Sequence, residues 1–262
     1  MKKMIALILA AVMVCCLLAA CGGKKNDLNL VEDGKLVMST NAQFPPYEMV
    51  ADGDGFYKGF EGIDVEIAVA LAEKLGLELV IDDMDFDSAL TAVQNNKSDM
   101  VLAGLTYRED RDEVMDFSTS YAKGVQVVIV PDGSDITDLD ALEGKMIGTQ
   151  RGTTGYIYAS DTPENDGYGE DHVLAYDNGA LAVQALLNGQ IDAVVIDDAP
   201  AKEYVAANPG LKILETEYIT EDYCLAVDEG NAELLDVLNT IIETMIDEGL
   251  VDEIVSHYIT AE

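Results

Sequence analysis

Apolar residues along the chain occur in two patterns that alternate. Short apolar runs bounded by polar turns are typical of buried strands, and longer segments with an apolar residue at every third or fourth position are typical of helices. In residues 63–75, Ile63, Ile67 and Leu71 fall on one helical face, and Gly76 follows as a helix-ending signal. The alternation predicts an α/β fold of mainly parallel sheets covered by helices.

The same patterns locate the individual elements. Strands are predicted at residues 35–40, 77–81, 100–103, 125–130, 146–149, 173–176, 193–196, 211–214 and 223–227. Helices are predicted at residues 63–75, 88–95, 154–160, 180–188, 199–207, 232–247 and 250–258. The elements form two successive alternating sets, and the chain is long enough for two small domains.

Residues 93–103 and 186–196 share one organisation. In each, a helix end is followed by a polar turn, an aspartate and an apolar strand. Gly104 and Asp197 therefore lie just past the ends of equivalent strands, where ligands of open α/β sheets bind. Two lobes that face each other by these edges would enclose a cleft. The alternative is that any two strand–helix–strand units look this similar.

The first part of the chain has the layout of a secretory signal. Two lysines precede a long apolar run that leads to small residues and a cysteine. The run from Leu18 to Cys21 resembles a bacterial lipobox, in which the cysteine is lipidated and becomes the first residue of the mature chain. We expect a signal peptide at residues 1–20, and a lipidated Cys21 with a flexible tether over residues 21–34. A retained membrane helix is the alternative, although the run is close to the minimum length for a span.

Composition narrows the choice of partners. The 262 residues include 50 Asp and Glu against 15 Lys and Arg, a formal net charge of −35. A nucleic acid backbone would be repelled, so we expect no nucleic acid partner, and an anionic membrane surface is an equally poor electrostatic partner. Hydrophobic residues make up 49% of the chain, enough to build a core. Without the signal peptide, Cys224 is the only cysteine besides Cys21, and we expect it to be a small buried hydrophobe.

Motifs of common catalytic, nucleotide and metal sites are missing from the sequence. It has two histidines and no H-E-x-x-H, C-x-x-C, G-x-S-x-G, Walker or G-x-G-x-x-G motif. The stretch from Asp52 to Gly55 hints at a calcium loop, but the other EF-hand ligands are absent, and we interpret it as a solvated turn. We therefore expect no metal and no cofactor.

Candidate binding groups stand on loops that follow the predicted strands. Arg111 could hold a carboxylate by two parallel hydrogen bonds, and Asp197 on the opposite lobe could hold an ammonium. An arginine and an aspartate that face each other across a cleft match a zwitterion, an amino acid. Hydroxyl, backbone and aromatic groups could complete the site: Gly104, Thr106, Gly152, Thr153, Thr154, Gly155, Phe44, Tyr47 and Phe86.

Each of these residues also has a structural interpretation that involves no ligand. Arg111 could form a surface ion pair with Asp112 or Glu113. Asp197 and the two threonines after Gly152 could cap helices. The aromatic residues could belong to the core.

Several segments, by their order and spacing, carry a resemblance to a known family. They are residues 44–48 (Phe-Pro-Pro-Tyr-Glu), 62–68, 103–106, 116–118, 152–154 and 188–193, together with Arg111 and Asp197. From about Lys35 to Tyr258 the chain resembles the solute-binding proteins of polar amino acid ABC transporters. The resemblance implies a two-lobed periplasmic-binding-protein type II fold, in which two crossover strands form a hinge. It also implies that the protein has no enzymatic turnover.

The resemblance also implies roles for particular residues. Arg111 would hold the α-carboxylate of the ligand with Thr106 and with Thr153 or Thr154. Asp197 would hold the α-ammonium together with the backbone of two residues in the other lobe, Ala103 and Gly104. Phe44 and Phe86 would flank the ligand side chain, and Asn41 and Gln150 would also belong to the binding site.

Three positions depart from the family pattern. Asn41 stands where members that take cationic or amide side chains often have an acid, which weakens the case for lysine or arginine. Arg151 replaces a neutral residue or lysine, and could reach an acidic side chain or lie in solvent. Cys224 replaces a common glycine and could simply fill space near the hinge.

Lobe boundaries, partners and location follow from the resemblance. Lobe 1 would comprise residues 35–121 plus 223–262, and lobe 2 residues 122–222. The protein would be a monomer outside the cytoplasm, tied to the bacterial membrane through Cys21, and would deliver its amino acid to an ABC transporter permease on lobe closure. A cyclohexadienyl dehydratase-like enzyme is one rival, but no carboxylate stands out as its acid. A receptor's sensory module is another, and it would need a membrane helix after the lobes.

Overall fold

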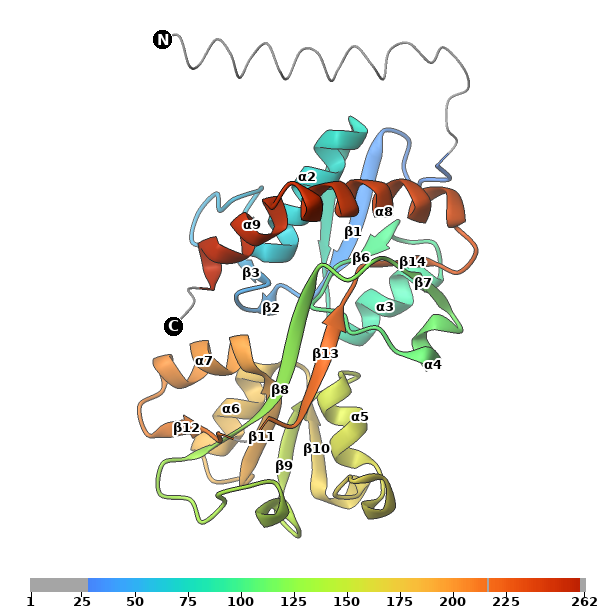
Figure 1. The fold of residues 1–262 in the computed structure, drawn as a ribbon. Helices are drawn as coiled ribbons and strands as arrows, with labels where there is room; N and C mark the ends of the chain where they lie inside the picture. The colour runs from blue at the N-terminus through green and yellow to red at the C-terminus, as the bar shows by residue number, and fades with distance from the viewer. Residues whose placement is uncertain (1–27, 216, 260–262) are drawn as a thin grey trace, which may run out of the picture.

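The computed structural model describes residues 28–215 and 217–259. The predicted signal peptide, Cys21 and the first part of the tether lie outside the described residues. Two lobes, each an α/β unit with its own sheet, stand one above the other (Figure 1). Within the described ranges, no helix is both long and apolar enough to cross a membrane.

The upper lobe in Figure 1, which we call lobe 1, is built on a five-stranded sheet with the order β5-β1-β6-β14-β7. Strands β5, β1 and β6 are parallel, whereas β14 is antiparallel to both of its neighbours. The bounds are β1 (Lys35–Thr40), β5 (Glu78–Asp83), β6 (Met100–Val101), β7 (Met115–Phe117) and β14 (Ala226–Asp228). A smaller sheet beside it contains β2 (Gln43–Phe44), β3 (Glu48–Val50) and β4 (Phe60–Glu61).

Helices cover both faces of the lobe 1 sheet, and its central strands are therefore buried on both sides. Met100 packs into the core beneath one set of helices, and its neighbour Val101 packs with α3 (Phe86–Gln94) on the other face. The first set consists of α2 (Ile63–Leu75), α8 (Ala232–Asp247) and α9 (Leu250–Tyr258). Gly76 ends α2 in the left-handed conformation, as its sequence signal predicts. A short helix, α4 (Glu109–Asp112), precedes β7.

The lower lobe, lobe 2, is built on a six-stranded sheet with β13 paired to β8 beside the path β10-β9-β11-β8-β12. Val194 and Ile196 pack on one face with α6 and α7, while Val195 packs on the face of α5. The strands are β8 (Ala122–Pro131), β9 (Ile147–Gln150), β10 (Val173–Tyr176), β11 (Ala193–Asp197), β12 (Leu211–Ile213) and β13 (Ile219–Tyr223). The helices are α5 (Thr154–Ser160), α6 (Gly179–Leu187), α7 (Asp198–Ala207) and the 3-10 turns η1 (Asp140–Leu142), η2 (Pro163–Asn165) and η3 (Glu170–His172).

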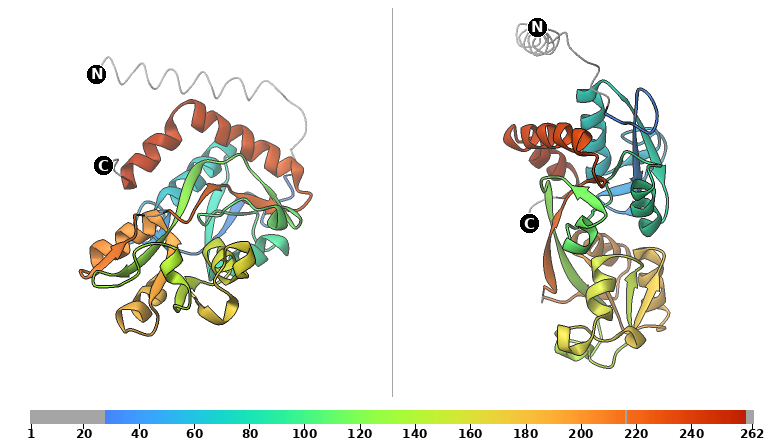
Figure 2. Two further views of the ribbon diagram at one scale, coloured as in Figure 1. Left: turned by 60° about the horizontal axis from the view of Figure 1, so that its bottom comes forward. Right: turned by 90° about the vertical axis from the view of Figure 1, so that its right-hand side faces the viewer.

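Strands β8 and β13 connect the two lobes. They pair antiparallel over the full length of β13, from Ile219 to Tyr223. Both run along one side of the molecule, as the right-hand view of Figure 2 shows. Cys224 follows β13 and is buried, and burial raises the pKa of its thiol to about 12, so it packs as the small hydrophobe that the sequence predicts.

The strand predicted at residues 223–227 is wrong, because this segment belongs to two sheets. Tyr223 pairs with Ala122 in lobe 2, and Ala226 pairs with Val101 and Phe117 in lobe 1. An apolar run looks the same whether one sheet or two sheets bury it. The prediction therefore missed the change of sheet.

The other predicted elements are present. Six have the predicted bounds: 35–40, 63–75, 154–160, 173–176, 232–247 and 250–258. The bounds of the rest differ from the prediction by a few residues. The small sheet, β7 and α4 were not predicted, because they are too short to show a period. Both main sheets are mixed rather than mainly parallel. In lobe 2, β8 pairs antiparallel with β11, β12 and β13, and in lobe 1, β14 pairs antiparallel with β6 and β7.

Close packing at the crossing strands can be tested at Gly124. A methyl group added there would collide with the ring of Tyr223, which is wholly buried. We expect Gly124→Ala to lower the free energy of unfolding by about 1–3 kcal/mol through overpacking, as measured by urea denaturation. Gly133, in the turn after β8, has open space around it, so Gly133→Ala is the matched control. Equal stability of the two variants would contradict the packing argument.

Candidate functional site

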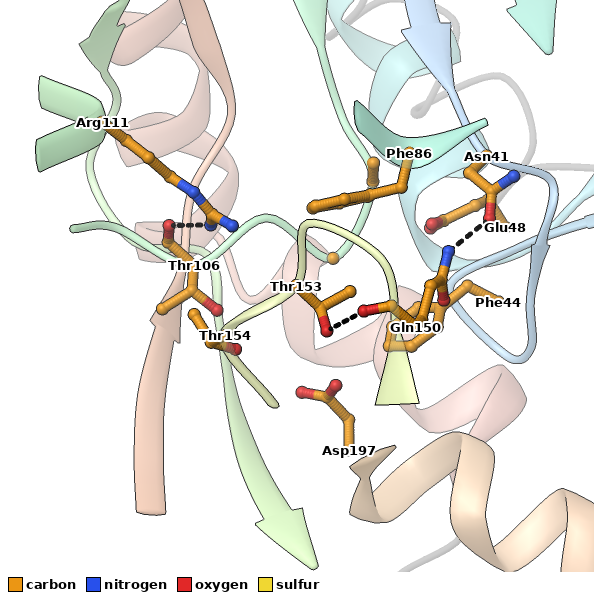
Figure 3. Close-up of a pocket in the computed structure, with 12 residues that line it drawn as sticks. Asn41, Phe44, Glu48, Phe86, Thr106, Arg111, Gln150, Thr153, Thr154 and Asp197 are labelled. Carbon is orange, nitrogen blue, oxygen red and sulfur yellow. Dashed lines mark hydrogen bonds between the residues drawn. The ribbon is translucent and has the colours of Figure 1, made fainter. Parts of the chain in front are cut away.

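A pocket lies between the lobes and is lined by residues of both. Eleven residues that the sequence predicts as ligand contacts line it, together with one residue that was not predicted, Glu48 (Figure 3). Three further sequence candidates, Tyr47, Gly152 and Gly155, are not among the lining residues. The lining residues are Asn41, Phe44, Glu48, Phe86, Ala103, Gly104, Thr106, Arg111, Gln150, Thr153, Thr154 and Asp197. That these side chains bind a ligand stays a prediction.

Strand ends bring these residues together from distant parts of the sequence. Ala103 and Gly104 follow β6 in lobe 1, Gln150 ends β9, and Asp197 ends β11 in lobe 2. Gly104 has a φ of +53° and lies against the ring of Phe44, which a Cβ there would meet at 2.7 Å. A glycine is therefore required at this point of close approach.

Hydrogen bonds across the pocket hold the two lobes against each other. The Gln150 amide donates to Asn41 Oδ1 at 3.0 Å, and Arg111 donates to the carbonyl oxygen of Gly152 at 2.9 Å. At the rim, Asn178 of lobe 2 donates to the Gln43 side chain of lobe 1 at 2.6 Å. The conformation is therefore a closed one.

Arg111, on α4, is buried, with 7% of its surface exposed. Its guanidinium donates to two carbonyl oxygens, that of Thr106 at 2.9 Å and that of Gly152 at 2.9 Å, and it lies 5.7 Å from the centre of the Phe86 ring. Burial lowers its pKa to about 10, so it keeps its charge at neutral pH. A surface ion pair with Asp112 or Glu113 is not what the structure shows.

Asp197 occupies the N-cap position of α7, but its side chain makes no capping hydrogen bond. Its Oδ1 instead accepts a hydrogen bond from the Tyr223 hydroxyl. Burial, and then the nearby charge of Glu221, raise the pKa of Asp197 to about 7. Asp197 thus lines the pocket, and no ion pair joins it to a cation among the described residues.

The two threonines at the start of α5 differ. Thr153 is the N-cap residue, and its hydroxyl donates to the Gln150 carbonyl at 2.8 Å and accepts from the Tyr156 amide at 3.4 Å. The helix-cap interpretation therefore describes Thr153. The Thr154 hydroxyl instead donates to the buried carboxylate of Glu221, at 2.9 Å.

The two other arginines of the chain, Arg108 and Arg151, do not line the pocket. Arg151 is exposed and lies 3.8 Å from Asp177. Arg108 pairs with Asp110 at 2.8 Å and lies over the Tyr158 ring, where it lines a separate open groove. Neither arginine reaches the groups that line the pocket.

Glu48 is the lining residue that sequence reasoning missed. It is wholly buried, and burial and the neighbouring Asp64 raise its pKa well above the usual range, which favours the protonated form. Burial raises the pKa of Asp64 as well, to about 6, and Asp64 accepts from the Gly104 amide and the Tyr121 hydroxyl, each at 2.8 Å. The available signal was an acid that directly follows the Phe-Pro-Pro-Tyr segment.

Comparison with known proteins agrees with this geometry. The sequence model of the bacterial extracellular solute-binding proteins, family 3, matches residues 36–261. The chain is 33% identical over 270 residues to a probable histidine-binding protein of Neisseria gonorrhoeae, covering 100% of this chain and 97% of the relative. It is 31% identical over 267 residues to the arginine-binding extracellular protein ArtP of Bacillus subtilis, with 100% of both chains covered.

Solved structures show the same fold. An ancestral arginine-binding protein bound to arginine is 37% identical, with a TM-score of 0.78 and coverage of 86% of this chain and 98% of that one. The substrate-binding protein of an amino acid ABC transporter is 34% identical, with a TM-score of 0.79 and coverage of 87% and 100%. The two-lobed fold predicted from the resemblance is therefore confirmed.

The burial of Asp197 leads to a prediction about stability and pH. Its pKa is about 7 in the folded chain against an ordinary 3.8, so between these values the folded state binds more protons than the unfolded state. The free energy of unfolding therefore falls as the pH rises through this window. Asparagine cannot ionise, so we expect Asp197→Asn to stabilise the ligand-free protein at pH 8 by on the order of 2–4 kcal/mol, and the gain to vanish near pH 4.

Urea denaturation across this pH range measures the effect. Asp198, the next residue, pairs with Lys202 at the surface, so Asp198→Asn is the matched control and should not gain stability. An Asp197→Asn curve that runs parallel to that of the original protein at every pH would contradict the prediction.

Proposed function

The chain belongs to the bacterial extracellular solute-binding proteins of family 3, and from this premise we propose that it binds one polar amino acid in the pocket between its lobes. The observation that carries the proposal is the placement of Arg111 and Asp197. One comes from lobe 1 and the other from lobe 2, both are buried, and both line a single pocket. An α-amino acid has a charged group to match each of them.

Arg111 would hold the α-carboxylate. Two of its N–H groups already donate to the carbonyl oxygens of Thr106 and Gly152, which fixes the guanidinium plane, and the remaining donors are available. Asp197 would hold the α-ammonium with the carboxylate oxygen that Tyr223 does not use. Since water is largely excluded from the closed pocket, both interactions are stronger than they would be at a surface.

The far end of the pocket favours a ligand side chain that has N–H donors. Figure 3 places Asn41, Gln150 and Phe44 at the end opposite to Arg111. The Asn41 amide donates to the Met84 carbonyl and its oxygen accepts from Gln150, so oxygen lone pairs remain toward the ligand. Among the described residues that line the pocket, Arg111 is the only cation, so an acidic ligand side chain would lack a partner. Relatives of the chain are named as binding proteins for histidine, arginine and glutamine.

Lobe closure would transmit the binding event. A ligand that bridges Arg111 and Asp197 binds the closed form better than an open one and shifts the population toward it. We propose residues 35–121 plus 223–262 as lobe 1, residues 122–222 as lobe 2, and the ends of β8 and β13 as the hinge. An ABC transporter permease would recognise the closed form.

We also propose that the protein acts as a monomer outside the cytoplasm, held at the bacterial membrane by lipid on Cys21. No turnover is part of the proposal, since the relatives are named as binding proteins. The acids that line the pocket are assigned to ligand binding or to contacts within the protein. None is assigned as the acid that would act on a leaving group, which argues against a dehydratase-like enzyme.

A thermal-shift screen of lipid-free residues 22–262 against the amino acids tests the proposal. We expect polar amino acids with side-chain N–H donors to raise the melting temperature, and aspartate and glutamate to have no effect. A ligand at 1,000 times its Kd adds roughly 4 kcal/mol to stability. If no amino acid or close analogue shifts the melting temperature, the proposed function is wrong.

An arginine pair provides the control for the same screen. Arg111→Ala should abolish the shift and leave the fold intact by circular dichroism. Arg151→Ala removes an exposed arginine outside the pocket and should retain the shift. A retained shift in Arg111→Ala would remove this residue from the site.

Lipid attachment is tested with the full chain expressed in a bacterium that is fed a labelled fatty acid. We expect the protein to carry the label and to lose it in Cys21→Ser, because the lipid is attached to this thiol. Cys224→Ser is the matched control, since Cys224 is buried, and should keep the label. Absence of label in the original protein would disprove the anchor.

A further inference from the structure

Glu221 lies directly behind the pocket and is not part of the lining. It is on β13, is 5% exposed, and uses one oxygen to meet three polar groups. Its Oε2 is 2.9 Å from Thr154 Oγ1, 3.1 Å from Thr106 Oγ1 and 3.0 Å from Gln126 Nε2. A buried carboxylate so surrounded acts as a hydrogen-bond acceptor for all three groups.

The three groups come from different parts of the fold. Thr106 follows β6 in lobe 1, Thr154 begins α5 in lobe 2, and Gln126 is on β8. Thr106 also forms a backbone bridge with Tyr223, so its loop lies along the second crossing. Glu221 therefore joins one pocket hydroxyl from each lobe at the strands that connect them.

Counting protons fixes what the two hydroxyls can offer to a ligand. Each hydroxyl has a single proton, and both protons point to Glu221. Only oxygen lone pairs then remain toward the pocket, and at Thr154 one of them also meets the Gln126 amide at 3.4 Å. In the closed form, Thr106 and Thr154 can accept hydrogen bonds from a ligand but cannot donate to it.

We propose that Glu221 is a positioning residue that makes Thr106 and Thr154 acceptors for the ligand's α-ammonium rather than donors to its carboxylate. The inference rests on the proposed function and differs from the role that the family resemblance implies for these threonines. With Asp197, the two hydroxyls supply three acceptors, as many as an ammonium has protons. The carboxylate then depends on Arg111.

A second feature supports the assignment of this part of the site to hydrogen-bond acceptors. Glu221 Oε1 is buried and has no hydrogen-bond partner among the residues that the structure describes. It adds a second buried acceptor behind the two threonines, on the side of the pocket where Asp197 lies. In Figure 3, Thr106 and Thr154 lie between Arg111 and Asp197, where the α-carbon groups of an amino acid would dock.

Glu221→Gln tests the proposal because an amide has the same shape but can donate, which frees the threonine hydroxyls to rotate. Calorimetry would compare an amino acid from the screen with two analogues: the 2-hydroxy acid, which lacks the ammonium, and the amino acid amide, which lacks the carboxylate. We expect the variant to bind the amino acid at least about tenfold more weakly. The ratio of its affinities for the amino acid and the hydroxy acid should fall by a similar factor. The ratio of its affinities for the amino acid and the amino acid amide should not change.

Asp222→Asn is the matched control, because Asp222 is the next residue on β13 but pairs with Lys123 at the surface. It should bind all three compounds as the original protein does. Thr106→Val and Thr154→Val keep the shape of the side chain and remove an acceptor, so each should weaken binding of the amino acid more than binding of the hydroxy acid. These variants test the inference even if Glu221→Gln folds poorly.

The outcomes separate the two proposals. If the original protein binds no amino acid, the proposed function is wrong. Suppose that it binds one, but Glu221→Gln or the valine variants weaken binding of the amino acid and of the hydroxy acid by the same factor. Then Glu221 is only structural and the inference is wrong. Unchanged binding in these variants overturns it as well.

Discussion

The burial of charges of both signs between two lobes is the constraint on which the rest of the structure depends. Arg111 and Asp197 are each 7% exposed in the closed form. A buried charge is costly unless it is paired and hydrogen-bonded. Arg111 meets two carbonyl oxygens and Asp197 meets one hydroxyl, so both retain capacity that a zwitterion could satisfy. The closed pocket is thus prepared for a ligand at a cost to the ligand-free protein.

Acidic residues behind the pocket extend this arrangement. Asp64 accepts from the Gly104 amide in the pocket and from Tyr121 next to the first crossing. Glu221 accepts from hydroxyls of both lobes on the second crossing. Both crossings are thereby connected by hydrogen bonds to groups at the pocket surface.

Sequence reasoning found Gly104 and Asp197 because they follow equivalent strands, and the family resemblance supplied others, such as Asn41. The parallel between residues 93–103 and 186–196 placed Gly104 and Asp197 at equivalent edges, and the structure brings both to one pocket. It missed Glu48 and gave no role to Glu221. Glu48 stands in a loop without a period, and Glu221 is on a strand whose predicted start was four residues too late. Neither residue is near its partners in sequence.

The sequence by itself determined the order of helices and strands, because the spacing of apolar residues is a local property that decides which face of each element is buried. It also determined which chemical groups follow the strands, among them Arg111 and Asp197. Only the tertiary structure decided that residues 223–227 change sheets and that Thr106 and Thr154 share one acceptor. Hydrogen-bond direction depends on neighbours far away in the chain: Glu221 lies 115 residues from Thr106. A hydroxyl can donate or accept, and the fold alone supplies the carboxylate that selects between the two.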